Sequence, residues 1–123
     1  MYNEKKVILI VDDDPTNRSV LAFPLKNRPE FEVIEASDGA QALAILNGKK
    51  ADLILLDIHM PNMNGIEFLK ARLQNPEIRE IPVLMVSTDD TQKKEAEAYG
   101  ANGYLVKPIS PSKIYELISP YLS

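Results

Sequence analysis

The stretch ILIVDDDPTN, residues 8–17, places four apolar residues directly before three adjacent aspartates. A continuous apolar run is typical of a strand covered on both faces, as in a parallel sheet with helices on each side. The aspartates are costly neighbours, because two carboxylates about 5 Å apart at an effective dielectric constant of about 20 repel each other by roughly 3 kcal/mol. A bound cation, a shared proton or exposure to water can offset this repulsion, and the rest of the sequence indicates which.

The composition is that of an ordinary globular domain. The 123 residues are enough for a sizeable core, and we expect one domain over residues 1–123. The basic residues are scattered and the net charge is -4, so we expect no nucleic-acid partner. The longest apolar runs are about five residues, so we expect no membrane span, and we see no signal peptide. The absence of cysteine excludes disulfides and fits a cytoplasmic protein.

Strand and helix patterns alternate along the whole chain. Strands are expected at residues 6–11, 31–35, 52–56, 82–86 and 104–106. Helical signals follow each strand, and the mixed segment 31–35 suits a sheet edge. This alternation predicts right-handed crossovers and an α/β fold. With five strands, we expect a flavodoxin-like (βα)5 doubly wound sandwich with a parallel sheet in the order 2-1-3-4-5.

Local signals predict where the helices begin and how they pack. Asp38 with Gln41 resembles a capping box, and Ser110 is a candidate N-cap before a proline. Pro24 inside the first helix costs on the order of 3 kcal/mol, which predicts a kink or irregularity. The helix at 91–99 is mainly alanine and charge, so it should be the most loosely held. The last helix should bury one apolar face made of Ile114, Leu117, Ile118, Tyr121 and Leu122.

Polar residues follow the predicted strands at the points where the strands end. They are Asp12 and Asp13, Asp57, Ser87 and Thr88, and Lys107. Ligands of open α/β sheets bind outside the carboxyl ends of the strands, where the strand order reverses. Three carboxylates, with a single histidine in the chain, favour a hard cation, and Mg²⁺ is the first choice. A metal beside a carboxylate nucleophile, a hydroxyl and an ammonium group is suited to handling phosphoryl groups.

Four features stand in order along the chain: the acidic pair 12–13, DIHMPNMNG at 57–65, the hydroxyl residue Ser87 and GANGYLVKP at 100–108. With these features the sequence resembles the response regulator receiver domain, the phosphoacceptor of two-component signalling, over essentially the whole chain. Each segment alone is a weak signal, but the four together in this order and spacing are highly specific.

The resemblance implies a role for each site residue. Asp57 corresponds to the phosphorylated aspartate, and Lys107 to the lysine that pairs with the phosphoryl group. Asp13, Asp57 and the backbone carbonyl of His59 would bind Mg²⁺ directly, and Asp12 would help through water. The Lys107-Pro108 peptide bond is often cis in the family.

The resemblance also implies a switch and its partners. Ser87 would move toward the phosphoryl group, and Tyr104 would turn inward behind it. The donor would be a histidine kinase or a histidine phosphotransfer protein, and the fourth helix, fifth strand and fifth helix would bind an effector or a second copy.

No enzyme activity is expected beyond self-phosphorylation and autodephosphorylation. Thr88 departs from the small residue usual at its position and would narrow access for the phosphodonor, and His59 and Asp89 occupy positions that tune dephosphorylation.

Two alternative functions stay open on the sequence. The first is a pseudo-receiver, an interaction module that never turns over phosphate. The second is a haloacid dehalogenase-like phosphatase, because DDDPT at 12–16 fits its DxDxT motif with Asp12 as nucleophile and Asp14 as general acid/base. That motif leaves Asp57 unexplained, and Asp14 is equally suited to capping the helix that begins at Pro15.

Overall fold

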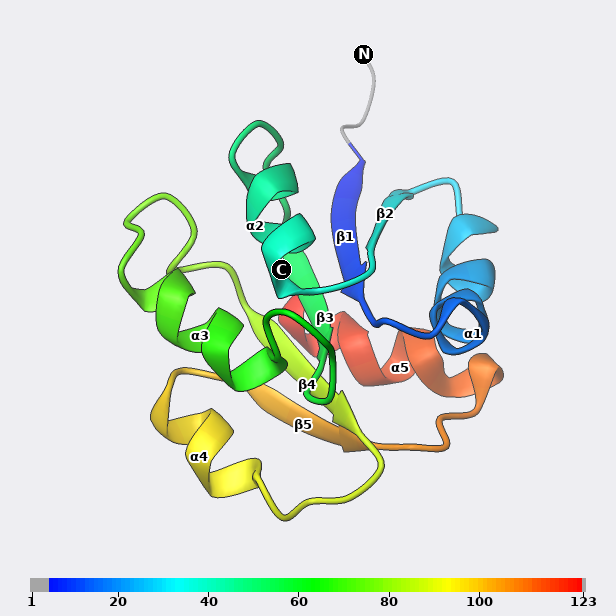
Figure 1. Cartoon of the computed structure of the whole chain (residues 1–123). Coiled ribbons are helices and arrows are strands. Elements are labelled where there is room, and N and C mark those ends of the chain that lie inside the picture. The colour runs from blue at the N-terminus through cyan, green and yellow to red at the C-terminus, as the bar shows by residue number, and fades with distance from the viewer. Residues whose placement is uncertain (1–4, 123) are drawn as a thin grey trace.

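One parallel sheet forms the centre of the protein in the computed structural model, which describes residues 5–122 (Figure 1). Its strands are β1 (Lys6–Val11), β2 (Phe31–Ala36), β3 (Leu53–Asp57), β4 (Val83–Ser87) and β5 (Gly103–Val106). The strand order is β2-β1-β3-β4-β5 and every pair is parallel, which confirms the predicted topology and places the mixed segment at an edge. β4 begins after Pro82, which has no N–H to donate.

Helices cover both faces of the sheet (Figure 1). They are α1 (Pro15–Lys26), α2 (Gly39–Leu46), α3 (Gly65–Leu73), α4 (Lys93–Ala98) and α5 (Ile114–Ile118). Ile8 and Ile10 of β1 belong to the core formed with α1 and α5, whereas Leu9 and Val11 belong to the core formed with α2, α3 and α4. Because each face of the sheet has its own helical layer, every apolar residue of the opening run is buried.

Side chains cap three of the helices. Asp14 Oδ1 accepts a hydrogen bond from the Thr16 amide at 2.9 Å at the start of α1, and Asn64 forms a complete capping box at the start of α3. The Asp38 side chain caps α2 by accepting from the Gln41 amide. In a capping box the Gln41 side chain would accept from the Asp38 amide, but here Gln41 Oε1 accepts from the Ser37 amide at 2.5 Å. α1 continues through Pro24 and ends two residues later, at Lys26.

The last helix differs from its prediction. It consists of the five residues of α5 between two 3₁₀ turns, η1 (Pro111–Lys113) and η2 (Ser119–Tyr121). The α-helix ends before η2 because Pro120 has no N–H to continue the α-helical bonding. Ser110 makes no side-chain capping bond. Ile114 and Ile118 are buried as predicted, whereas Leu117 is 37% exposed, so its assignment to the buried face is wrong.

α4 has the fewest buried residues of the helices α1 to α5, in line with its alanine-rich and charged sequence. It spans six residues, and Ala96 is its one buried side chain. Within residues 5–122, no helix is long and apolar enough to cross a membrane.

Candidate functional site

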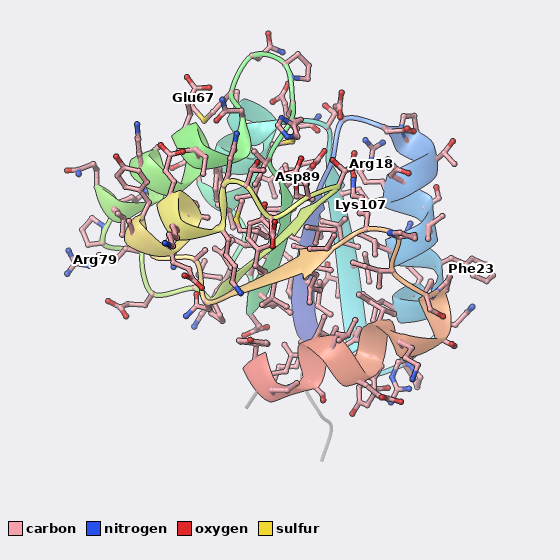
Figure 2. All side chains as sticks on the ribbon, turned by 90° about the horizontal axis from the view of Figure 1, so that it is seen from below. Arg18, Phe23, Glu67, Arg79, Asp89 and Lys107 are labelled. Carbon is pink, nitrogen blue, oxygen red and sulfur yellow. The ribbon has the colours of Figure 1, made fainter. Side chains whose placement is uncertain are left out.

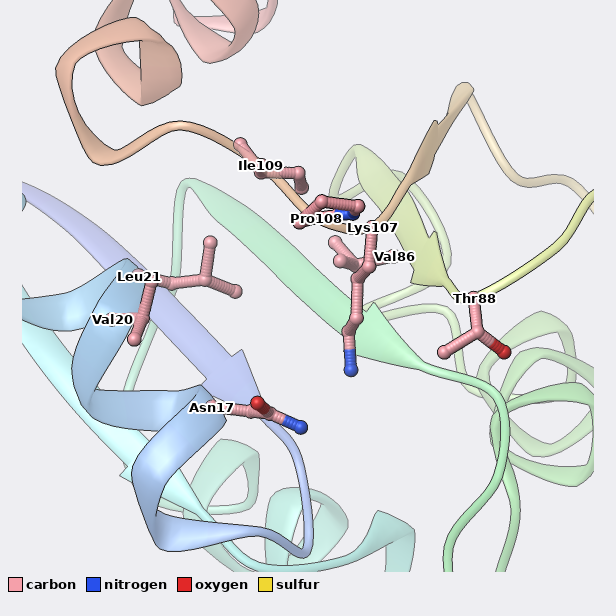
Figure 3. A pocket seen from close by; sticks show the side chains of 8 residues that line it. All are labelled: Asn17, Val20, Leu21, Val86, Thr88, Lys107, Pro108 and Ile109. Carbon is pink, nitrogen blue, oxygen red and sulfur yellow. The ribbon is translucent and has the colours of Figure 1, made fainter.

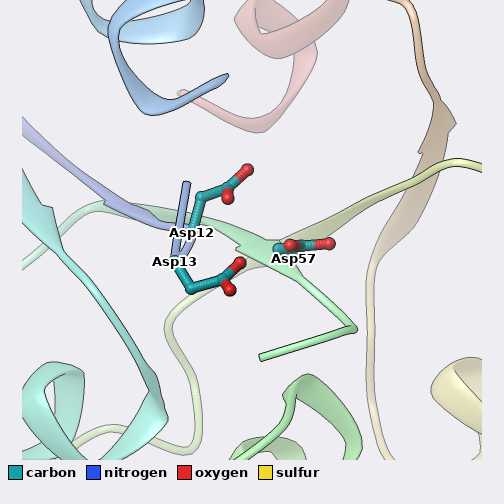
Figure 4. A group of neighbouring side chains, drawn as sticks. All are labelled: Asp12, Asp13 and Asp57. Atoms are coloured by element: carbon teal, nitrogen blue, oxygen red, sulfur yellow. The ribbon is translucent and has the colours of Figure 1, made fainter. Parts of the chain in front are cut away.

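Three carboxylates meet at the carboxyl ends of β1 and β3, which are neighbours in the sheet (Figure 4). Asp12 and Asp13 follow β1, and Asp57 is the last residue of β3. One carboxylate oxygen of each lies within 4.8 Å of the other two. Asp12 and Asp57 are only 1% and 7% exposed, whereas Asp13 is exposed. The convergence predicted from the sequence is therefore present, and two of the three charges are buried.

Lys107 supplies a positive charge to this cluster. Its Nζ lies 3.1 Å from Asp12 Oδ2 and 3.8 Å from Asp57 Oδ1. The Lys107 amide donates to the Ser87 carbonyl at 2.6 Å, which ties the end of β5 to the end of β4. The Lys107-Pro108 bond is cis, as the resemblance implied. The repulsion among the aspartates is thus reduced in two ways, by one shared lysine for the buried pair and by the solvent exposure of Asp13.

One lysine does not fully compensate the buried pair. Burial, and next the charge of Asp12, raise the pKa of Asp57 above its usual range. Lys107 and the backbone amides of His59 and Ile58 act in the opposite direction but do not cancel the rise. Since an opposite charge nearby favours the ionised form, a cation bound here would stabilise the Asp57 carboxylate.

Ser87 lies on β4, the strand next to that of Asp57, and Tyr104 lies on β5, the strand beyond β4. Ser87 is fully buried at the end of β4, and its Oγ has no hydrogen-bond partner among the described residues. An unsatisfied buried polar group costs about 1–3 kcal/mol, so this hydroxyl is poised for an acceptor. Tyr104 of β5 is half-buried, and its hydroxyl donates to the Asp89 carbonyl at 2.8 Å.

An open groove adjoins the cluster, between α1, the end of β4 and the segment after β5 (Figure 3). Leu21, Val86 and Ile109 are among its apolar lining residues. Figure 3 shows Lys107 extending between Asn17 of α1 and Thr88 of the loop after β4. Thr88 is exposed at this opening.

The remaining predicted residues lie at the margin of the site. His59 is exposed, two residues beyond Asp57. Asp14 uses its carboxylate to cap α1, and its amide donates to Asp12 Oδ1 at 2.9 Å. In the phosphatase reading, Asp14 would have to serve as general acid/base for Asp12. The geometry does not support a phosphatase, because the Asp14 carboxylate accepts the hydrogen bond from the Thr16 amide that caps α1.

Sequence reasoning missed two residues that shape the site. Arg18 of α1 donates from Nη1 to the Asp12 carbonyl at 2.6 Å, and a charged residue on a helix carries no signal for such a contact. Gly65 begins α3 against the end of β3, where an added Cβ would lie 2.5 Å from the Asp57 carbonyl oxygen. Gly65 belongs to the motif at 57–65, but only the three-dimensional structure shows that it must lie close to the backbone of Asp57.

The model of the response regulator receiver domain family matches residues 8–119. With the fold and the acidic cluster described above, this shows that the chain belongs to the response regulator receiver domain family. It is a receiver domain of two-component signalling.

Chemotaxis regulators of the CheY type are among the relatives and solved structures that the chain resembles. It is 36% identical over 113 residues to the chemotaxis protein CheY of Pseudomonas aeruginosa, covering 90% of this chain and 91% of that protein. The solved structure of the chemotaxis protein CheY4 of Vibrio cholerae has a TM-score of 0.90 at 34% identity, covering 96% of this chain and 99% of that chain. The Mn²⁺-bound form of the response regulator Rcp1 has a TM-score of 0.83 at 29% identity, covering 96% of this chain and 95% of that chain.

Proposed function

We propose that Asp57 accepts a phosphoryl group from a phosphohistidine of a histidine kinase or histidine phosphotransfer protein. One observation carries the proposal: neighbouring strands β3, β4 and β5 present, at the same edge of the sheet, a carboxylate, an unpartnered buried hydroxyl and an ammonium group. These belong to Asp57, Ser87 and Lys107. A nucleophile, a hydrogen-bond donor and a cation in this arrangement are what phosphoryl transfer requires.

The transfer follows from this arrangement. A carboxylate oxygen of Asp57 forms a bond to phosphorus, and the bond between phosphorus and the donor imidazole nitrogen breaks. The imidazole keeps the electron pair and takes up a proton. Lys107, whose Nζ already lies 3.8 Å from Asp57 Oδ1, would face the phosphoryl oxygens, and the Ser87 hydroxyl would donate to one of them. The product is an aspartyl phosphate on the protein itself, so we propose no enzyme turnover beyond self-phosphorylation and autodephosphorylation.

We propose Mg²⁺ as the cation of the acidic cluster. The donor set fits, because three carboxylates within 4.8 Å of one another offer the hard oxygen ligands that Mg²⁺ takes. Asp13, Asp57 and the His59 carbonyl would hold the ion directly, with Asp12 acting through water. When bound, the ion would neutralise charge on the phosphoryl oxygens. The Mn²⁺-bound state of the similar Rcp1 structure supports a divalent cation in this fold.

We propose that phosphorylation alters a binding face made of α4, β5 and α5. The Ser87 hydroxyl would turn to the phosphoryl group, and Tyr104, whose hydroxyl is bonded to the Asp89 carbonyl before α4, would move inward with it. The face already exposes Val106 of β5 by 49% and Leu117 of α5 by 37%. A downstream effector or a second copy of the chain would bind to this face.

We also propose a cytoplasmic location for the protein.

Incubating the protein with acetyl phosphate or phosphoramidate tests the proposed function directly. With Mg²⁺ the intact mass should increase by one phosphoryl group, and with a chelator it should not change, because the charges of the reacting oxygens are then uncompensated. Thr88 at the groove opening could block small donors, so a phosphorylated histidine phosphotransfer protein serves as the second donor. No labelling from either kind of donor would contradict the proposal and favour the pseudo-receiver.

Mg²⁺ should also stabilise the folded protein, since it would bind the native carboxylate cluster and not the unfolded chain. At a concentration about 100-fold above the dissociation constant, the free energy of unfolding should rise by about 2.7 kcal/mol. Thermal unfolding at constant, low ionic strength measures this, and Asp13→Ala should remove most of the gain.

Asp14→Ala is the matched control for that experiment. It removes a neighbouring carboxylate that caps α1 and lies outside the cluster. The variant should unfold at a lower temperature because of the lost cap, yet keep the wild-type response to Mg²⁺. Equal melting temperatures of the wild type with and without Mg²⁺ would count against the metal site.

A further inference from the structure

An arginine of α1 reaches the backbone of the acidic loop. Arg18 Nη1 donates to the carbonyl oxygen of Asp12 at 2.6 Å, and the arginine side chain is only 18% exposed. Figure 2 shows Arg18 and Lys107 at the same end of the sheet. Both contact Asp12, but in different ways, because Lys107 contacts the carboxylate whereas Arg18 contacts the main chain.

The bonded carbonyl belongs to the peptide that joins Asp12 to Asp13. A peptide unit is planar, so orienting its carbonyl also orients the two Cα atoms at its ends. β1 ends at Val11, and the two aspartates therefore lie just beyond the regular strand. A single hydrogen bond from Arg18 thus acts on the directions in which both carboxylates leave the backbone.

The arginine is itself held in place from a second strand. Its Nε donates to Glu35 Oε1 at 3.1 Å, and Glu35 lies on β2 opposite Ile10 of β1. Glu35 also accepts a hydrogen bond from Lys26 at 2.7 Å, and this bond, more than the bond from Arg18, lowers the pKa of Glu35 below its usual range. Glu35 therefore remains charged, and the planar guanidinium is fixed between Glu35 and Asp12.

We propose that Arg18 is a positioning residue for the phosphorylation site, one that holds the Asp12–Asp13 peptide so that the two carboxylates can share a cation with Asp57. The inference rests on the proposed function, since it concerns the same metal and the same phosphoryl transfer. Arg18 does not touch the reacting atoms and acts through the backbone of Asp12.

Electrostatics and positioning predict opposite effects when Arg18 is replaced. As a charge alone, Arg18 repels a cation, so Arg18→Met would tighten Mg²⁺ binding. As a positioning residue, its loss should raise the Mg²⁺ dissociation constant by about tenfold, the effect typical of losing a group that orients metal ligands. The sign of the change therefore separates the two explanations.

Two further variants sharpen the test. Arg18→Lys keeps the charge but cannot present two planar donors to Asp12 and Glu35 at once, so it should weaken Mg²⁺ binding although electrostatics predicts no change. It also serves if Arg18→Met fails to fold. Lys26→Met is the matched control, because Lys26 is 51% exposed and pairs with the same Glu35 but, unlike Arg18, does not hydrogen-bond Asp12. It should change the dissociation constant by less than about twofold.

The experiment is Mg²⁺ titration by calorimetry, together with labelling by acetyl phosphate over a range of Mg²⁺ concentrations. Both Arg18 variants should need more Mg²⁺ for half-maximal labelling and approach the wild-type extent at saturation. Unchanged or tighter Mg²⁺ binding in Arg18→Met and Arg18→Lys, with the wild type labelled normally, would overturn the positioning role alone. A wild type that neither binds Mg²⁺ nor is labelled would overturn the proposed function instead.

Discussion

Replacing Asp57 with asparagine should abolish Mg²⁺-dependent labelling by acetyl phosphate, the largest functional effect that we expect from one substitution. The amide is nearly the same size as the carboxylate, but it has no anionic oxygen to attack phosphorus. The intact mass after incubation should therefore stay that of the unmodified variant. Persistent labelling of Asp57→Asn would show that another residue is the phosphoacceptor.

The same variant should remain folded, which makes the loss of labelling interpretable. The raised pKa of Asp57 reflects an ionised group disfavoured by burial and by the charge of Asp12. A neutral amide removes this repulsion, so Asp57→Asn in chelator should unfold at or above the wild-type temperature. It should also respond less to Mg²⁺, because one of the three carboxylates is gone.

Asp12→Asn is the informative comparison. Asp12 contacts Lys107 at 3.1 Å, and we assign it an indirect role at the metal, so labelling should be slower but still present. If labelling disappeared in Asp12→Asn and survived in Asp57→Asn, the phosphatase reading with Asp12 as nucleophile would be favoured.

Replacing Gly65 with alanine should cause the largest loss of stability among single-methyl changes at the site. The new Cβ would lie 2.5 Å from the Asp57 carbonyl oxygen and 2.9 Å from Ile58 Cα. Both are backbone atoms, so no side-chain rotation can relieve the overlap, and α3 must shift from β3. We expect a loss of about 3 kcal/mol and a decrease in melting temperature of roughly 10 °C, measured by thermal and urea unfolding.

The change at Gly65 should also weaken the site, because Asp57 itself must move. Gly48→Ala is the matched control, since the added Cβ would have no neighbour within 4 Å. Its stability should stay within about 1 kcal/mol of the wild type. Equal losses in the two variants would show that the close approach at Gly65 is not what limits stability.

The topology and much of the site could be predicted because their signals are local. The apolar run at 8–11 is buried on both faces, and the mixed segment at 31–35 lies at a sheet edge. Once the strand order follows, the ends of β1, β3, β4 and β5 must meet. The predicted convergence of Asp12, Asp57 and Lys107 is therefore a consequence of topology.

Other features depend on contacts between residues far apart in the chain. Lys107 and Asp12 are separated by 95 positions, and only packing decides that Lys107 Nζ lies closer to Asp12 than to Asp57. Packing also leaves the Ser87 hydroxyl without a partner among the described residues and brings Arg18 to the acidic loop. Such contacts leave no periodic pattern in the sequence.

The sequence by itself thus determined the alternation of strands and helices and the polar residues at the strand ends, because hydrophobic periodicity and strand ends are properties of neighbouring residues. For five such strands the common doubly wound order then indicates the edge at which the site forms and the residue types that meet there. The tertiary structure alone decided which carboxylates are buried, which cation each contacts, and where a glycine or an arginine must stand beside them. These depend on distances of a few ångströms between separate elements, which only the packed chain defines.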